Sequence, residues 1–107
     1  MQPTWLTFDN EDRMLTVNGW YEEVHAGALG EVVWERWPDA APIFKPVYDQ
    51  ARREGFAYKV VEYRGLLVEI HCTSVDNLLH VCLQQWTLEG LREALDRLDG
   101  VLTASAA

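Results

Sequence analysis

The sequence is poor in basic residues and has no long apolar run. Nine Lys and Arg stand against seventeen Asp and Glu, which gives a formal net charge of −8 in 107 residues. Proteins that bind a nucleic-acid backbone or an anionic membrane need a basic surface to displace counterions or to meet the lipid charge. No stretch approaches the roughly 20 apolar residues of a membrane-spanning helix. We therefore expect no direct nucleic-acid binding and no membrane attachment.

The signature motifs of common enzyme classes are also missing. The sequence has no G-x-x-x-x-G-K-[ST], G-x-G-x-x-G or G-x-S-x-G, the loops that hold phosphates and dinucleotides or present a nucleophilic serine. Residues 1–5 lack the basic and apolar regions of a signal peptide. Two cysteines without C-x-x-C spacing suit a reducing compartment. These absences favour a cytoplasmic protein without catalysis and without a cofactor.

The length and the hydrophobic content of 49% fit one acidic domain over residues 1–107. Near the carboxyl terminus, four leucines recur at three- and four-residue steps. This pattern predicts an amphipathic helix over 88–99 with Thr87 as its N-cap. A shorter helix is predicted over 46–54, because proline suits a first helical position and Gly55 can end the helix.

Three strand-like runs lie between these helices and predict an antiparallel meander over about 56–86. A three-residue loop over 63–65 would pair Glu62 with Leu66, and a four-residue loop over 74–77 would join the second and third strands. Alternation then places nine side chains on one face of the meander: Phe56, Tyr58, Val60, Val68, Ile70, Cys72, Leu79, Val81 and Leu83. We expect the leucine face of the last helix to cover this face.

The amino-terminal third is less regular. Residues 5–17 resemble a β-hairpin around an acidic turn. Over 20–37 a helix capped by Asn18 competes with a second tight turn at Asn18-Gly19 that leads into a strand, and we slightly favour the helix. Either alternative gives an α+β domain.

The order helix, three antiparallel strands, helix over 46–99 resembles a double-stranded RNA-binding domain in its topology. In that family the last helix begins with lysines that contact phosphates, whereas here it begins with Leu88, Glu89 and Gly90. The resemblance therefore concerns the order of elements, and it implies no RNA binding for this acidic chain.

Negative charge and tryptophan gather in the amino-terminal third. Residues 1–39 hold eight acids and two bases (net −6), whereas residues 40–107 hold nine acids and seven bases (net −2). Four of the five tryptophans also lie in the first segment. Indole rings are enriched at the centres of interfaces, and a negative field speeds encounter with a basic protein. The competing explanation is that most of these rings belong to the core and that the acids only maintain solubility.

We therefore expect a non-catalytic acidic module that inhibits or regulates a basic protein partner. An immunity protein, an antitoxin, a phage-encoded inhibitor such as an anti-CRISPR protein, and a DNA mimic all act in this way. The residues expected to steer and anchor the partner are Glu22, Glu23, Glu31, Glu35, Trp34 and Trp37.

Two alternatives stay open. A homodimeric structural or accessory subunit would use a second copy to cover the other face of the meander, which carries Val61, Leu67 and Trp86. A small metal- or thiol-dependent enzyme would use the polar residues predicted on that same face, and these are also the weak candidates for metal ligands: His71, His80, Cys82 and Glu69. Cys72 and Cys82 point to opposite faces in this register, so we expect no disulfide between them.

Overall fold

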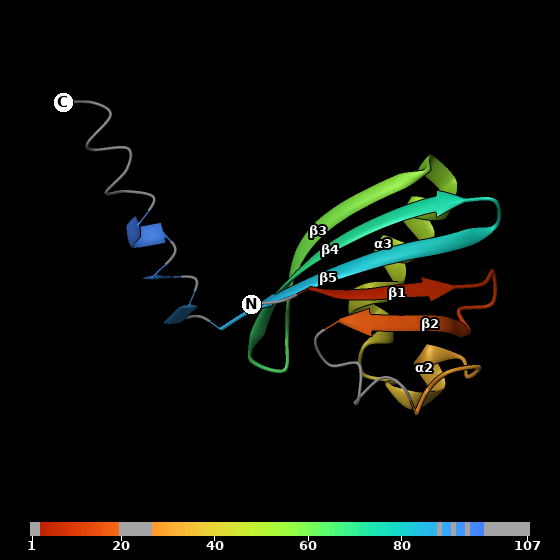
Figure 1. Ribbon diagram of the computed structural model, residues 1–107, viewed down its shortest axis with the longest axis horizontal. Coiled ribbons are helices and arrows are strands. Elements are labelled where there is room, and N and C mark those ends of the chain that lie inside the picture. The colour runs from red at the N-terminus through yellow and green to blue at the C-terminus, as the bar shows by residue number, and fades with distance from the viewer. Residues whose placement is uncertain (1–2, 20–26, 88, 91, 94, 98–107) are drawn as a thin grey trace.

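Strands from both halves of the chain form one antiparallel sheet in the computed structural model, which describes residues 3–19, 27–87, 89–90, 92–93 and 95–97. The strands are β1 (Thr4–Phe8), β2 (Met14–Gly19), β3 (Phe56–Tyr63), β4 (Leu66–Val75) and β5 (Leu78–Trp86). Their order in the sheet is 2-1-5-4-3, because β1 pairs along the whole of its length with β5 (Figure 1). The predicted hairpin and the predicted meander are both present, but the hairpin extends the meander into a five-stranded sheet.

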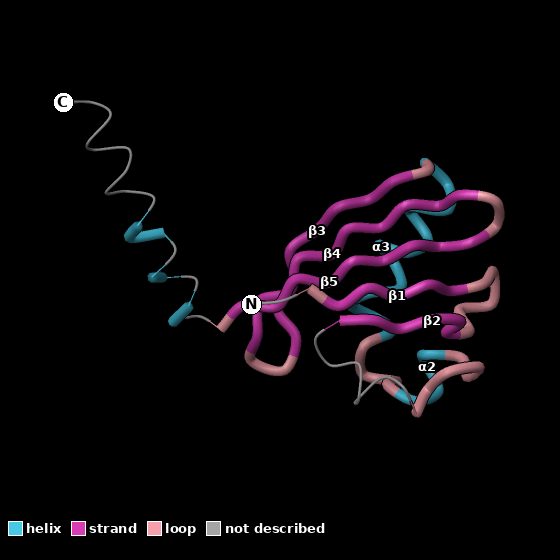
Figure 2. Tube along the Cα trace, viewed as in Figure 1, coloured by secondary structure: helices cyan, strands magenta, loops and turns pink. Residues whose placement is uncertain are grey.

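One face of this sheet is covered by the helix α3 (Ala41–Glu54), which packs on β3, β4 and β5 (Figure 2). The buried residues of α3 recur at steps of three, one and three, so that they form one apolar stripe: Phe44, Val47, Tyr48 and Ala51. The strands direct their own buried residues to the same side. The sheet therefore has one helix-covered face and one open face.

The prediction that helix 88–99 covers the sheet is wrong. Its described residues are helical, and the Gly90 N–H donates to Thr87 Oγ1 at 2.9 Å, which confirms the predicted N-cap. However, Leu95 is 52% exposed, and these residues lie away from the sheet in Figure 1. The other three leucines of the stripe lie outside the described residues. The position over the sheet belongs to α3 instead.

α3 is longer than the helix predicted over 46–54. It begins at Ala41, where Pro42 falls in the first turn and its missing N–H has no intrahelical partner to lose. The predicted end is confirmed: Gly55 has φ 89°, and its N–H donates to the Ala51 carbonyl at 2.7 Å. No helix in the described part of the chain has the length and the apolar character needed to cross a membrane.

The register between β3 and β4 differs from the predicted one by one residue. Arg64 and Gly65 both have positive φ, at 51° and 78°, and they form a two-residue turn that pairs Tyr63 with Leu66. The prediction assigned the left-handed conformation to the glycine alone and therefore made the loop one residue too long. Because side chains alternate along a strand, the shift reverses the two faces of β3. Ala57 is buried beneath α3, and the three larger residues predicted there point to the open face.

The register between β4 and β5 differs by two residues, which leaves both faces as predicted. Asp76 and Asn77 have φ values of 52° and 64° and make a second two-residue turn, which pairs Val75 with Leu78. The six predicted core residues of these strands are buried: Val68, Ile70, Cys72, Leu79, Val81 and Leu83.

The segment predicted as ambiguous, 20–37, lies only partly within the described residues. Residues 20–26 lie outside them, and the rest forms turns followed by the single helical turn α2 (Val33–Arg36). Two backbone contacts tie this segment to β2: the Met14 N–H donates to the Glu31 carbonyl at 3.0 Å, and the Gly30 N–H donates to the Met14 carbonyl at 2.7 Å.

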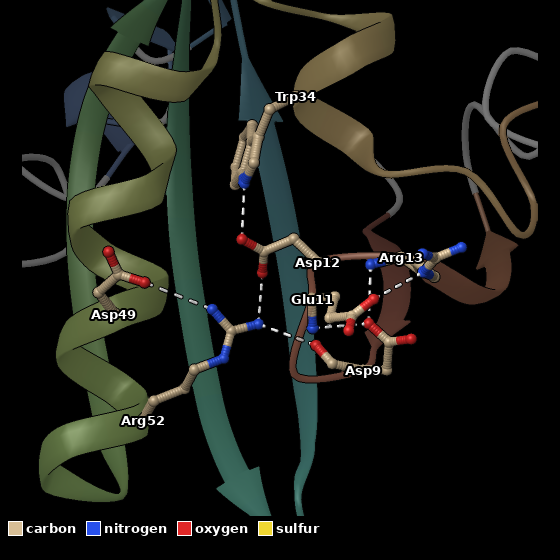
Figure 3. A network of polar contacts seen from close by, with 7 residues as sticks. All are labelled: Asp9, Glu11, Asp12, Arg13, Trp34, Asp49 and Arg52. Atoms are coloured by element: carbon tan, nitrogen blue, oxygen red, sulfur yellow. Dashed lines mark hydrogen bonds and ion pairs between the residues drawn. The ribbon is translucent and has the colours of Figure 1, made fainter.

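A buried carboxylate joins these elements. Asp12 lies in the turn between β1 and β2 with φ 62°, and its side chain is 7% exposed. Its Oδ1 accepts a hydrogen bond from Arg52 of α3, and its Oδ2 accepts one from Trp34 Nε1 of α2 at 2.6 Å (Figure 3). Arg52 also donates to the Asp9 carbonyl at 3.0 Å. The network fixes the hairpin and both helices relative to one another.

A second group of polar contacts holds the β3–β4 turn against the segment before α3. It joins Arg64 and Tyr63 to Asp39 and is called the Asp39 clip below. Arg64 donates from Nε and Nη2 to the Asp39 carboxylate at 3.1 and 3.2 Å, and the Tyr63 hydroxyl donates to the same group at 3.0 Å. The Arg64 hydrogen bonds hold the pKa of Asp39 below its usual value of 3.8, with a smaller contribution from Tyr63. Desolvation is the main cause that raises the pKa of Tyr63, and the hydrogen bond to Asp39 raises it further.

Substitution of Arg52 tests the buried network. We expect Arg52→Leu to lower the free energy of unfolding by about 2–3 kcal/mol, because Asp12 then stays buried without its cation. Arg53→Leu, at an exposed position of the same helix, should change it by less than about 0.5 kcal/mol. Urea unfolding followed by tryptophan fluorescence measures both values, and equal losses for the two variants would contradict the role given to Asp12.

The Asp39 clip predicts a pH dependence. A carboxyl group with a lowered pKa in the folded state stabilises the fold above its unfolded pKa, and this contribution is lost as pH falls through the folded pKa. We expect NMR titration to place the Asp39 midpoint below 3.8 in the wild type and nearer 3.8 in Arg64→Met. Tyr63→Phe should move the midpoint less than Arg64→Met does. A midpoint that Arg64→Met leaves in place would show that the guanidinium does not act on Asp39.

Candidate functional site: the open face of the sheet

The open face presents rows of side chains that cross three or four strands. The strand register aligns Trp5, Cys82, His71 and Tyr58 in one row, running from β1 to β3. The adjacent row is Thr7, His80, Thr73 and Phe56, and Gln84, Glu69 and Val60 form the row on the other side. Residues in directly opposed pairs have Cβ atoms about 5 Å apart, so each row is a continuous contact surface.

Large apolar side chains lie uncovered on this face. Trp5 is 55% exposed, Phe56 54%, Tyr58 50% and Val60 46%. Three of these four belong to β3, where the shorter turn reversed the predicted faces. Exposed apolar patches with a polar rim are typical of surfaces that bind another molecule.

A shallow hollow of about 190 Å³ lies among these rows. Its lining includes the indole of Trp5, the two hydroxyls of Thr7 and Thr73, and the predicted polar residues: His71, His80 and Cys82. Beside it, the rings of Tyr58 and His71 have centroids 4.7 Å apart, and His71 Nε2 lies 3.5 Å from Glu69 Oε2. The hollow therefore combines an aromatic wall with hydrogen-bonding groups.

The charge of this face is acidic. Among the described residues, no Lys or Arg of the five strands points to it, whereas Glu62 and Glu69 do. Lys59, predicted on this face opposite Glu69, pairs with Ile70 and points to the side of the sheet that carries α3. The reversal of β3 thus removes a cation from the open face and adds three apolar side chains.

The predicted polar set lies together on the open face, but in a different arrangement. His71 lies opposite Cys82, and His80 lies opposite Thr73, so the two histidines are diagonal neighbours instead of a directly opposed pair. No group of three or more His, Cys, Asp or Glu in the described part of the chain is arranged to hold a metal ion. Burial, followed by the charge of Glu69, raises the pKa of Cys82, which makes its thiolate scarcer at neutral pH.

The predicted partner-binding residues within the described part of the chain differ in their exposure. Glu22 and Glu23 lie outside the described residues. Glu31 pairs with Arg36 at 3.4 Å, whereas Glu35 is exposed on α2. The sequence favoured Trp34 and Trp37 as the exposed tryptophans. Both are partly buried and pack against the core, whereas Trp5 is more exposed than either. A sequence signal for the exposure of Trp5 was the alternation in β1: Leu6 and Phe8 are the apolar residues of one face, and Trp5 shares the other face with the polar Thr7.

A second hollow, of about 80 Å³, lies on the other side of the sheet beneath α3 and α2. Trp34, Trp37 and Tyr48 line it together with Gln85, whose Oε1 is buried without a hydrogen-bond partner among the described residues. Pockets for drug-sized molecules measure about 300–1,000 Å³. Both hollows are therefore smaller than a pocket for such a molecule, and the inner hollow is the smaller of the two.

The two cysteines give a test of the two faces. Both are free, with Cys72 buried beneath α3 and Cys82 half-buried on the open face, which confirms the predicted sides. Burial raises the pKa of Cys72 to about 12. We expect iodoacetamide to label Cys82 slowly in the native protein, with a rate that still rises above pH 9, and to label Cys72 only after unfolding. Native labelling that persists in Cys82→Ser would contradict this assignment.

No protein-family model matches the sequence, and no curated protein matches it. Among solved structures, the chain is similar to a crystal structure described as a sensory box sensor histidine kinase from Vibrio cholerae. The identity is 16%, the match covers 79% of this chain and 79% of that chain, and the TM-score is 0.66. At that identity the likeness concerns the fold alone. The chain has a PAS-like α+β fold, a five-stranded antiparallel sheet of order 2-1-5-4-3 with a central helix packed on it.

Proposed function

We propose that this chain is a non-catalytic regulatory module that binds a basic protein partner on the open face of its sheet. The observation that carries the proposal is the combination of uncovered aromatic side chains with acids, and no Lys or Arg among the described strand residues, on one face. The proposed function is the one expected from the sequence. The proposed binding surface, however, is the open face of the sheet and not the predicted set of acids and tryptophans in the amino-terminal third.

The two kinds of residue on this face have separate roles in binding. Glu62 and Glu69, within a chain of net charge −8, attract a cationic surface and raise the rate of encounter. Trp5 and Tyr58 supply rigid rings that lose little side-chain entropy when a partner covers them. An Arg or Lys of the partner can also lie over an indole or phenol ring, an interaction of about 0.5–2 kcal/mol.

The solved structure that resembles this chain supports a regulatory role. Its description is that of a sensor histidine kinase, a protein of signalling. For the present chain we extend the comparison only to this kind of work, regulation by binding, and inhibition of the partner is one form of it.

The homodimeric alternative uses the same surface. A second copy would also cover the aromatic side chains, but it would bring Glu62 and Glu69 of both copies to one interface. Like charges across an interface oppose association. For this reason the acidic face favours a basic partner over a second copy, and sedimentation at micromolar concentration distinguishes the two.

Affinity measurements on surface variants test the proposal. The chain serves as bait in an extract of its source cells, and the dissociation constant of each captured basic protein is then measured. We expect Trp5→Ser and Tyr58→Ser each to weaken binding by about tenfold or more. Leu29→Ser, an equally exposed apolar residue outside the sheet, should leave it unchanged. Glu69→Lys should slow association at low salt and have less effect at high salt.

Two results would contradict the proposal. One is a basic partner whose affinity all three open-face variants leave unchanged. The other is a partner that is lost when Glu35→Lys and Trp37→Ser are introduced instead, which would restore the surface expected from the sequence.

A further inference from the structure

We infer that the free edge of β3 accepts an extended strand of the basic partner, which adds a sixth strand to the sheet. The inference deepens the proposed function, because it states how the partner is held, and it rests on that function for the partner's basic character. The starting observation is the position of β3 at the end of the order 2-1-5-4-3, with a strand neighbour on one side only (Figure 1).

The backbone of β3 has unused hydrogen-bonding groups at this edge. In a hairpin with a two-residue turn, the residues that flank the turn are hydrogen-bonded to each other, and bonded pairs then alternate along the ladder. Tyr63 flanks the turn, so the odd-numbered residues of β3 face β4. The Ser74 N–H donates to the Gly55 carbonyl at 3.0 Å, in agreement with this alternation. The N–H and C=O groups of the even-numbered residues therefore point to the free edge.

The same even-numbered residues carry the exposed side chains of the open face: Phe56, Tyr58, Val60 and Glu62. The eight pairs between β3 and β4 run without a bulge, and the strand contains no proline. Proteins usually blunt an edge strand with a bulge, a proline, a short length or a covering segment. β3 carries the charged side chains of Lys59 and Glu62, which are also found on protected edges, but it lacks the bulge and the proline, it is eight residues long, and none of the described segments lies along its edge in Figures 1 and 2.

The opposite edge of the sheet has three of these protections: a bulge, a shorter length and a covering segment. β2 is shorter, and its register with β1 shifts at a bulge between Thr7 and Phe8. The start of β2 is bonded to the segment before α2, through the bridge between Arg13 and Val32 and the bridge between Met14 and Leu29. The contrast between the two edges singles out β3 as the one available for strand addition.

The chemistry of β3 indicates the occupant. An antiparallel strand would place three residues opposite Val60, Tyr58 and Phe56 on the open face, where apolar or β-branched side chains give favourable cross-strand pairs. The residue opposite Glu62 would be a Lys or Arg. The partner segment is therefore an extended stretch with apolar residues at alternate positions and a basic residue at its amino-terminal end.

A synthetic peptide tests this inference on the full-length protein. The probe is Lys-Thr-Val-Thr-Val-Thr-Val, blocked at both ends, and the readout is amide hydrogen exchange followed by NMR. In the free protein, we expect the amides of Tyr58, Val60 and Glu62 to exchange fast and those of Lys59 and Val61 slowly. A saturating concentration of the peptide should slow the first group by about tenfold or more.

A pair of variants at one position isolates the backbone contribution. Val60→Pro removes an N–H that points to the free edge, a place where proline is tolerated, and it should weaken peptide binding by about tenfold or more. Val60→Thr keeps this N–H and should bind within about twofold of the wild type. Peptide methylated on alternate backbone nitrogens, on the side that faces β3, should not bind to either protein.

The outcomes separate this inference from the proposed function. Peptide binding with fast exchange at Tyr58, Val60 and Glu62, or no peptide binding at all, overturns strand addition and leaves the open face as a candidate surface. Equal protection by a peptide with Glu in place of Lys upholds strand addition and contradicts the basic character of the partner. Slow exchange of these amides in a free protein that sediments as a dimer assigns the edge to a second copy, which also overturns the inference.

Discussion

The fold depends on a carboxylate that has been taken out of water. Asp12 joins its turn to two segments further along the chain, one 22 residues away at Trp34 and the other 40 residues away at Arg52. Because removal of an ionised group from water is costly, such a group is retained only where its partners are fixed in place. The network therefore ties α3 and α2 to the β1–β2 turn on the side of the sheet where they pack. By holding α3 and α2 to one face, it leaves the other face to solvent or to a partner.

Local patterns predicted much of this structure. Gly55, directly after Glu54, marks the end of α3, the alternation in β4 and β5 identifies their buried faces, and Thr87 caps the helix that follows. Each of these features depends on residues within a few positions of one another. The pairing of β1 with β5 does not, since 71 residues separate Phe8 from its partner Leu79, and no local periodicity reports it. The helix that covers the sheet was predicted five residues too short, because Pro46 resembled a helix start, whereas it is a residue within the helix.

The two faces of β3 were assigned in reverse because of the conformation of one turn. Arg64 adopts a left-handed conformation that a residue with a Cβ rarely takes. Its guanidinium is held there by Asp39, which is 25 residues away in the sequence. A tertiary contact thus shortens the loop by one residue. Because side chains alternate with a period of two along a strand, this shift of one residue moves every side chain of β3 to the opposite face of the sheet. Sequence reasoning that treats turns as local cannot detect this.

The exchange of faces also explains why acid and aromatic residues meet on one surface. Lys59 moves to the side of α3, and the open face keeps Glu62 and Glu69 without a cation from the described strands. Within a strand, the direction of a side chain and the lateral direction of its backbone groups alternate together. The residues of β3 that show their rings on the open face are therefore the same ones whose amides reach the free edge. One register consequently gives β3 both an apolar, acidic face and an unpaired ladder of hydrogen-bonding groups, so that a single extended segment can contact both at once.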